Sequence, residues 1–154
     1  MEVTLTLAPY EDKPVLARLL ELYNHDMSEF YEELRVSEHG LFQYRYLDHY
    51  WTEEGRYPYL IRAGGKIAGF VLVRQVDGVF QVAEFFVLRY FRRAGIGAMA
   101  AGAAFQKHPG NWEVWHASSN APAAALWRRV VPVTAARAEE GSEVVYRFEA
   151  PPTP

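Results

Sequence analysis

Small and basic residues gather in one short stretch of the chain, ArgArgAlaGlyIleGlyAla at 92–98. An apolar run precedes it, and residues 94–107 are predicted to form a helix. The first turn of a helix has free backbone N–H groups at the positive end of the helix dipole, and together they bind phosphate oxygens. Gly95 and Gly97 carry no side chain that would block a phosphate group. The stretch therefore predicts a site for a phosphorylated cofactor; the alternative is an ordinary helix start with tight packing.

Two other phosphate-binding loops fit the sequence less well. A P-loop requires Gly-Lys-Ser/Thr, which does not follow these glycines. Residues 95–100 do match the dinucleotide pattern G-x-G-x-x-A. However, the next strand has Glu113 in its middle rather than an acid at its end, and an antiparallel hairpin precedes the motif. A dinucleotide site is therefore disfavoured.

Glu84 lies within AlaGluPhePheVal, a segment predicted to be a largely buried strand. A buried carboxylate costs free energy unless it is paired or hydrated. Alternation along a strand places it on one face with Val82 and Phe86. Burial would raise its pKa toward the range useful for a general base; the alternative is a structural carboxylate. His116, at a strand end, is a second candidate for proton transfer, and the five histidines show no metal-ligand spacing.

The elements that must position these residues follow from periodicity and turn signals. Alternating residues predict strands, apolar residues three or four apart predict helices, and Gly64-Gly65 predicts a hairpin turn. For 24–56 we expect one or two short helices. The remaining predicted strands are 3–7, 57–63, 66–73, 79–88, 111–117 and 142–149, and the remaining predicted helices begin near Pro14 and span 94–107 and 120–131. This order implies an α/β (α+β) fold, a mixed sheet with helices on both faces.

Composition limits the class of protein. A chain of 154 residues, half of them hydrophobic, predicts a single globular domain at 1–150 with a frayed tail at 151–154. The net charge of −3 gives no general attraction to nucleic acid or to an anionic membrane. The absence of cysteine excludes disulfides and a cysteine nucleophile. No signal peptide or membrane-spanning run is evident, so we expect a cytoplasmic protein, as a monomer or a homodimer.

The phosphate-loop stretch resembles the acetyl-coenzyme A loop of the GCN5-related N-acetyltransferases (GNAT). That family pattern, R/Q-x-x-G-x-G/A, follows a strand that ends in Val and an aromatic residue. Here the pattern is formed by Val87, Phe91, Arg92, Gly95 and Gly97. The resemblance continues after the next strand with Asn120, Ala123, Leu126 and Trp127, and it is specific over 80–131. The chain departs from the family where Trp127 stands in place of the usual Tyr, and where ValValPro at 130–132 replaces Gly-Phe.

The resemblance implies a mostly antiparallel sheet of six to seven strands, with a V-shaped split between the strands at 79–88 and 111–117. The pantetheine arm of acetyl-coenzyme A would pair with the backbone of Phe86 and Val87. A backbone N–H near Val87 would stabilise the oxyanion, and Glu84 would accept the amine proton. No metal is needed. The other expected cofactor contacts are Arg92, Arg93, Ala94, Gly95, Ile96, Gly97, Ala98, Asn120, Ala123 and Trp127.

In the resembled family, the region 21–59 covers the acceptor site. Here it holds nine acids, three arginines and seven tyrosines. Acids and tyrosines together suit a cationic amine; the alternative is a solvated helical surface over aromatic core residues. We assign Tyr23, Asp26, Glu29 and Tyr57 to acceptor binding. The predicted activity is N-acetyl transfer to a small-molecule or peptide amine in a ternary complex; the alternative is a non-catalytic acyl-coenzyme A binder or sensor.

Overall fold

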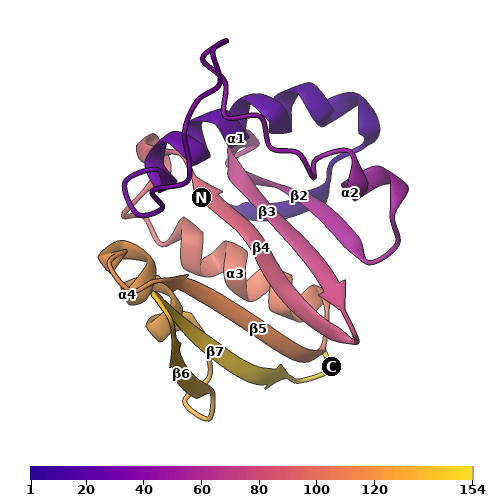
Figure 1. Ribbon diagram of the computed structural model, residues 1–154. Coiled ribbons are helices and arrows are strands. Elements are labelled where there is room, and N and C mark those ends of the chain that lie inside the picture. Colours follow the sequence, from indigo (N-terminus) through magenta and orange to yellow (C-terminus); the bar gives the residue numbers. More distant parts are fainter. Residues whose placement is uncertain (154) are drawn as a thin grey trace.

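Seven strands form one sheet in this computed structural model, which describes residues 1–153. The strand order is β1-β2-β3-β4-β5-β7-β6 (Figure 1). Every neighbouring pair is antiparallel except β4 and β5, which are parallel. The strands are β1 (Val3–Leu7), β2 (Arg56–Ala63), β3 (Lys66–Val76), β4 (Val79–Val87), β5 (Gly110–Ala117), β6 (Ala136–Glu140) and β7 (Glu143–Ala150).

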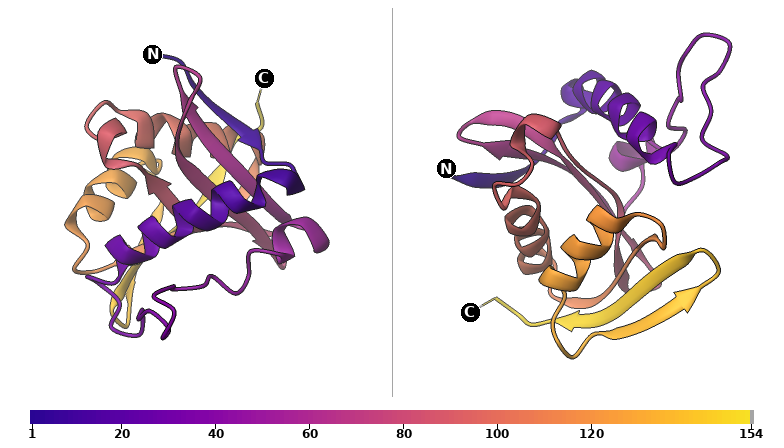
Figure 2. Two further views of the ribbon diagram at one scale, coloured as in Figure 1. Left: turned by 90° about the horizontal axis from the view of Figure 1, so that it is seen from above. Right: turned by 90° about the vertical axis from the view of Figure 1, so that its left-hand side faces the viewer.

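Helices cover both faces of this sheet, as the right-hand view of Figure 2 shows. One face carries α1 (Lys13–Met27) and the short α2 (His49–Thr52). The opposite face carries α3 (Ile96–Lys107) and α4 (Ala121–Val130). Two 3₁₀ turns, η1 (Tyr10–Asp12) and η2 (Arg89–Phe91), lead into α1 and toward α3.

Two cores result from the alternation of side chains along the central strands. On β3, Phe70 and Leu72 pack against α1, whereas Val71 and Val73 pack on the α3 side. All four are fully buried, and each such side chain contributes about 1.5–3 kcal/mol to folding. The small residues of α3 let that helix lie close to the sheet, because Ala100, Ala101 and Ala104 are fully buried. The small residues of α3 therefore allow close packing on the sheet, and they also keep the turn before the helix free of large side chains.

A split opens between β4 and β5. Only two residue pairs join these strands, Phe80 with Trp112 and Gln81 with Glu113. Beyond these pairs the strands diverge, as Figure 1 shows toward the α4 end of β5. The predicted V-shaped split is therefore present in the fold.

Gly69 on β3 allows the end of β4 to lie close to the β3 backbone. A Cβ at this position would stand 1.9 Å from the carbonyl oxygen of Phe86, a distance that no side chain can occupy. The end of β4, which borders the split, thus depends on a glycine in its neighbour.

The mixed, mostly antiparallel sheet with helices on both faces is confirmed, with three local differences from the sequence prediction. First, β6 was not predicted, because AlaArgAlaGluGlu has only one partly buried residue and no apolar alternation. Second, α1 extends into the region 24–56 as far as Met27, whereas the one short helix there, α2, agrees with the expectation of one or two. Much of 28–48 has no regular structure, although Tyr44 and Leu47 there contact the core.

The third difference concerns the face that Glu84 shares. Phe86 lies with Glu84 on the α1 side, but Val82 packs in the core on the α3 side. A β-bulge causes this, since Leu72 pairs with Glu84 while the next residue, Val73, pairs with Val82. The extra residue, Ala83, reverses the alternation. The prediction that Glu84 shares a face with Val82 is therefore wrong.

The end of the chain contacts α3, because the Thr153 hydroxyl donates to the carbonyl of Gln106 at 2.8 Å. Of the predicted tail at 151–154, residue 154 lies outside the described residues. Within residues 1–153, no helix has both the length and the apolar character required to cross a membrane.

Candidate active site

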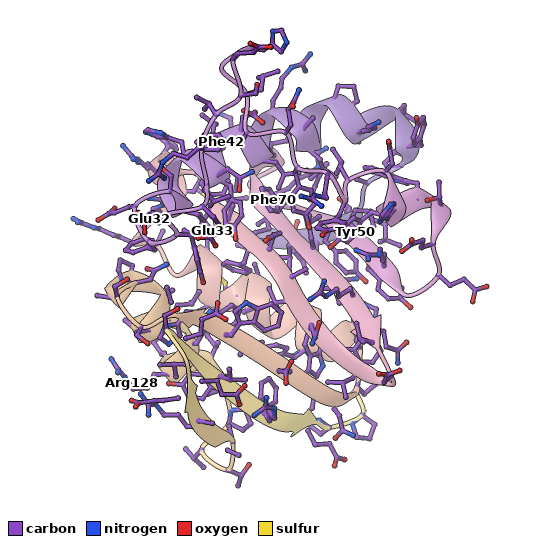
Figure 3. All side chains as sticks on the ribbon, in the orientation of Figure 1. Glu32, Glu33, Phe42, Tyr50, Phe70 and Arg128 are labelled. Carbon is purple, nitrogen blue, oxygen red and sulfur yellow. The ribbon has the colours of Figure 1, made fainter. Side chains whose placement is uncertain are left out.

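A cavity of about 660 Å³ occupies the split and extends to both faces of the sheet. The α1 side of its wall includes the irregular segment 28–48, on which Figure 3 labels Glu33 and Phe42. The α4 side includes the end of β5 and the first turns of α4. The cavity is lined by Tyr23, Asn24, Met27, Tyr31, Glu33, Leu34, Phe42, Gln43, Tyr44, Arg45, Tyr46, Arg74, Val82, Ala83, Glu84, Phe85, Trp115, His116, Ala117, Asn120, Ala123, Leu126, Trp127 and Glu143.

The turn before α3 exposes its backbone amides. Arg93 and Gly95 have positive φ values of 70° and 76°, which bend the chain into the helix. No side chain caps α3, and its first backbone hydrogen bond runs from the Met99 N–H to the Gly95 carbonyl. The amides of the first turn therefore have no partner within the helix and can bind an anion.

Gly97 lies where this turn meets the split. A Cβ there would stand 3.6 Å from Leu126 and 3.8 Å from Phe85 and Val87. The space beside Gly97 is thus bounded by α4 and by the end of β4. A larger side chain would fill the space between the first turn of α3 and the β4 edge.

Arg92 is held by protein groups on two sides. Its Nε donates to the carbonyl of Val87 at 2.8 Å, and its Nη2 donates to Asp26 at 2.7 Å. Arg89 also donates to Asp26, at 3.0 Å. Burial alone would raise the pKa of Asp26, but the two guanidinium groups outweigh it and hold that pKa below its usual value. Asp26 therefore ties the end of α1 to the loop before α3.

The end of β4 presents backbone groups to the split. The Leu88 N–H donates to the Ala68 carbonyl at 2.7 Å, closing the ladder between β3 and β4. Because hydrogen-bonding direction alternates along such a ladder, Phe86 directs its backbone groups toward β3. Phe85 and Val87 direct theirs toward the split, so Phe85 takes the place that was predicted from the sequence for Phe86. The Val87 carbonyl already accepts from Arg92, which leaves its N–H for a ligand.

Glu84 lies on the α1 side of the split, in contact with the cavity. Its Oε2 is buried and has no hydrogen-bond partner among residues 1–153. Burial raises the pKa of Glu84 to about 7, against smaller lowering effects of the Arg74 charge and of the Tyr23 hydroxyl. A carboxylate with this pKa is divided between its two protonation states near neutral pH, as general-base catalysis requires.

The predicted contacts on α4 gather at the other side of the cavity. Asn120 accepts a hydrogen bond from the Ala123 N–H at 3.1 Å and so caps α4, while also lining the cavity. Trp127 is buried and meets Phe85 edge to face, with ring centroids 5.5 Å apart. The structure thus brings Asn120, Ala123 and Trp127 to one wall.

Of the four residues assigned to acceptor binding, only Tyr23 lines the cavity. Asp26 is engaged by arginines of the cofactor loop, and Glu29 lies outside the lining. Tyr57 packs on the opposite face of the sheet, against His108 at 4.4 Å between ring centroids. The structure therefore does not bring these four together.

Other lining residues were not singled out from the sequence. Arg74 stands on β3, and Trp115 stands on β5. The available signal for Arg74 was a charge that directly follows the apolar run IleAlaGlyPheValLeuVal. His116, the second proton-transfer candidate, does line the cavity. Its Nδ1 lies 2.8 Å from the Ala117 carbonyl, and its buried Nε2 has no partner within residues 1–153.

Comparisons with known proteins agree with this geometry. The model of the acetyltransferase (GNAT) family matches residues 16–131. An acetyltransferase from Thermus thermophilus has a TM-score of 0.71 at 15% identity, covering 97% of both chains. PaiA N-acetyltransferase from Thermoplasma acidophilum, in complex with coenzyme A, has a TM-score of 0.70 at 10% identity, covering 97% of this chain and 99% of that one.

A third solved structure is spermidine N-acetyltransferase from Vibrio cholerae, in complex with CoA and spermine. Its TM-score is 0.68 at 15% identity, covering 96% of this chain and 95% of that one. No curated protein sequence matches the chain. Because the family model covers most of its length, the chain belongs to the acetyltransferase (GNAT) family. Acetyl-coenzyme A is the cosubstrate that this membership assigns to it, and the free amides before α3 fit its phosphates.

Proposed function

We propose that this protein is an N-acetyltransferase that transfers an acetyl group from acetyl-coenzyme A to a primary amine, by direct attack in a ternary complex. The observation that carries the proposal is Glu84. It is a partly buried residue in contact with the cavity, its buried Oε2 has no hydrogen-bond partner among residues 1–153, and its pKa is raised to about 7. A domain that only bound an acyl-coenzyme A would not need such a group.

The cofactor would be held mainly by the backbone. The amides of Gly95 to Ala98 would bind the pyrophosphate, aided by the positive end of α3. Phe85 and Val87 would pair with the pantetheine arm along the free edge of β4, and Asn120 and Ala123 would flank it. When bound, acetyl-coenzyme A supplies an activated thioester carbonyl. Arg92 holds the loop in shape through Val87 and Asp26, and the exposed Arg93 is available to the phosphates.

Two groups act on the reacting atoms in this proposal. Ionised Glu84 accepts a proton from the ammonium form of the acceptor, so that the neutral amine can attack. The Val87 N–H donates to the carbonyl oxygen on which negative charge develops. Both reach the split from β4, so one strand would supply the base and the oxyanion donor.

Trp127 is the observation that favours a second candidate, a non-catalytic acyl-coenzyme A sensor. The resembled family often has a tyrosine at this position, and an indole N–H cannot replace a phenol as a proton donor. Glu84 and its surroundings favour the enzyme. The similarity of the fold to the PaiA and spermidine N-acetyltransferases also supports acetyl transfer to an amine.

Two measurements separate the candidates. Coenzyme A and acetyl-coenzyme A should both raise the melting temperature by mass action. Release of coenzyme A should then accelerate when amines are added to the acetyl-coenzyme A complex. Cofactor binding without turnover on any primary amine would favour the sensor. The absence of both a melting shift and a binding heat would contradict either candidate.

A further inference from the structure

We propose that the acceptor is a small amphoteric amine, with a carboxylate beside its primary amine and an aromatic or branched apolar side chain. The hydrophobic α-amino acids form this class. The inference rests on the proposed N-acetyl transfer, and it narrows the acceptor through the charges and rings that line the cavity.

Four of the nine acids of 21–59 are engaged away from the cavity. Glu21 accepts from the backbone amides of Phe42 and Gln43, and Asp26 is bound by Arg89 and Arg92. Asp48 pairs with Lys13, and Glu53 pairs with Arg56. Of the nine acids in this segment, only the exposed Glu33 lines the cavity. Besides Glu33, the acids of the cavity wall are Glu84 and Glu143, and Glu143 accepts a hydrogen bond from Tyr31. The segment 21–59 itself therefore gives the cavity little of the negative charge that would attract a polycation.

Arg74 is a cation in the cavity wall without a counter-ion. It is partly buried, and no carboxylate of residues 1–153 lies within ion-pairing distance of it. Its Nε donates to Gln81 at 2.7 Å, and Gln81 donates to Glu113 at 2.7 Å. Glu113 in turn accepts from Arg147 at 2.7 Å.

This polar ladder crosses the sheet and fixes the guanidinium from one side. Neither Nη nitrogen of Arg74 donates a hydrogen bond to any of residues 1–153. A guanidinium held in this way matches the two oxygens of a carboxylate. We therefore assign the carboxylate of the acceptor to Arg74.

Glu84 and Arg74 are close enough to bind the two ends of one small molecule. Leu72 pairs with Glu84 across β3 and β4, and Arg74 lies two residues further along β3 on the same face. Diagonal neighbours in a regular ladder are about 7–8 Å apart. Here the bulge at Ala83 interrupts the ladder, and both side chains line the same cavity. The Arg74 charge acts on Glu84 without forming an ion pair with it. A ligand with its amine and carboxylate on the same carbon would bridge the two side chains.

Aromatic side chains form the rest of the acceptor side. Tyr23, Tyr44 and Trp115 line the cavity, and the Arg74 guanidinium stands 5.9 Å from the Trp115 ring centroid. Tyr31 closes one side, because its hydroxyl donates to Glu143 at 2.7 Å. Walls of this kind bury an aromatic or branched side chain with few polar contacts.

The first test compares matched acceptors that differ only in the carboxylate. With saturating acetyl-coenzyme A, kcat/KM is measured for L-phenylalanine and 2-phenylethylamine, for L-leucine and 3-methylbutylamine, and for spermidine. We expect each amino acid to exceed its matched amine by about tenfold to hundredfold, because a bidentate charged pair is lost without the carboxylate. Faster turnover of the matched amines or of spermidine would overturn the inference while leaving the proposed function intact.

Variants assign the preference to Arg74. Arg74→Gln should bring kcat/KM for each amino acid down to that of its matched amine. Both are compared at a pH where Glu84 is ionised, because the Arg74 charge also lowers the pKa of Glu84. Arg147→Gln is the control, because it breaks the same ladder outside the cavity and should retain the preference. An equal loss on both members of each pair in Arg74→Gln would contradict a carboxylate contact.

A binding measurement makes the inference independent of turnover. N-acetyl-L-phenylalanine keeps the carboxylate and the ring but has no free amine. In the presence of coenzyme A it should bind the wild-type protein and should bind Arg74→Gln at least about tenfold more weakly. Binding of this probe without turnover of any amine would contradict the proposed function alone. Equal binding to both proteins would contradict the inference alone.

Discussion

In the proposed function, the two sides of the split would recognise their ligands through different parts of the chain. On the cofactor side, the groups available to a ligand are mostly backbone groups of one short segment, from Phe85 to Ala98. On the acceptor side they are side chains from separate elements: Tyr23 on α1, Tyr44 on an irregular segment, Arg74 on β3 and Trp115 on β5. A site made of backbone requires glycines at fixed spacing, whereas a site made of side chains is assembled only when the chain folds.

The largest expected effect is on the rate, and it tests the side chain of Glu84 on the acceptor side of the split. Glu84→Gln should keep acetyl-coenzyme A affinity and lose about 10²–10⁴ in kcat, the usual range for removal of a general base. The base must be ionised, so the wild-type rate should rise with pH up to about 7 and then level off. The variant should lack this titration. A normal rate and pH profile would transfer the role of base to His116.

The same substitution has a consequence for stability that needs no turnover. The pKa of Glu84 is raised from 4.5 to about 7, so the folded state holds its proton more tightly than the unfolded state between these values. The free energy of unfolding of the wild type should therefore fall as pH rises through this window, by at most about 3 kcal/mol. Glu84→Gln should show no such fall. Parallel stability curves for both proteins would contradict the burial of this carboxylate.

The next largest effect concerns the cofactor side. Gly97→Val should weaken acetyl-coenzyme A binding by about a hundredfold or more, because a β-branched side chain would fill the space beside Leu126, Phe85 and Val87. Calorimetric titration with coenzyme A measures this. Gly102→Ala is the matched control on the same helix, since its Cβ would meet nothing within 4 Å. Unchanged affinity in folded Gly97→Val would contradict the phosphate-loop assignment.

A smaller effect tests the connection between the two sides. Asp26→Asn should raise the KM for acetyl-coenzyme A by about tenfold, with little change in kcat, because Arg92 and the loop lose a charged partner. Asp26→Glu should restore part of the affinity. Asp48→Asn removes another ion pair of this half of the chain, with Lys13, and should leave the KM unchanged. An unaltered KM in Asp26→Asn would mean that the loop keeps its shape without α1.

The smallest effect concerns Trp127. Trp127→Phe should lower the rate by about threefold or less, because water can protonate a leaving thiolate with a pKa near ~8.5. Trp127→Tyr should equal or exceed the wild-type rate if its hydroxyl reaches the leaving sulfur. Steady-state rates of both variants at saturating acetyl-coenzyme A decide this. A large loss in Trp127→Phe would show that the indole N–H takes part in the reaction.

The sequence predicted the local structure of the cofactor side of the split well, for physical reasons. The turn into α3, the strand before it and the cap at Asn120 each depend on local spacing, and the structure places all three as expected. Phosphate binding by that turn stays a prediction. Glu84 was also found from the sequence, because a carboxylate in an apolar strand is conspicuous. The bulge at Ala83 was not found, since it depends on pairing with β3 rather than on the residues of β4.

For the acceptor side of the split, the sequence offered only the residue composition of 21–59. Acids and tyrosines of 21–59 suggested a cationic ligand, but ion pairs and backbone hydrogen bonds engage four of the nine acids elsewhere. Of the other five, only Glu33 lines the cavity. Tyr57 illustrates the same difficulty, since alternation on β2 turns it toward the α3 face. Arg74 lines the cavity because of how β3 pairs with the strands beside it. The residues next to Arg74 in the sequence do not specify that pairing.

The sparse pairing of β4 with β5 leaves a strand edge in the middle of a sheet. Proteins normally protect such edges, because an unpaired row of N–H and C=O groups recruits strands from other chains and leads to aggregation. Here the exposed positions are Phe85 and Val87, beyond the last pair, Gln81 with Glu113. A bound cofactor arm would cover them. Coenzyme A should therefore act as a solubility factor, protecting these two amides from hydrogen exchange and slowing aggregation even when no acceptor is present.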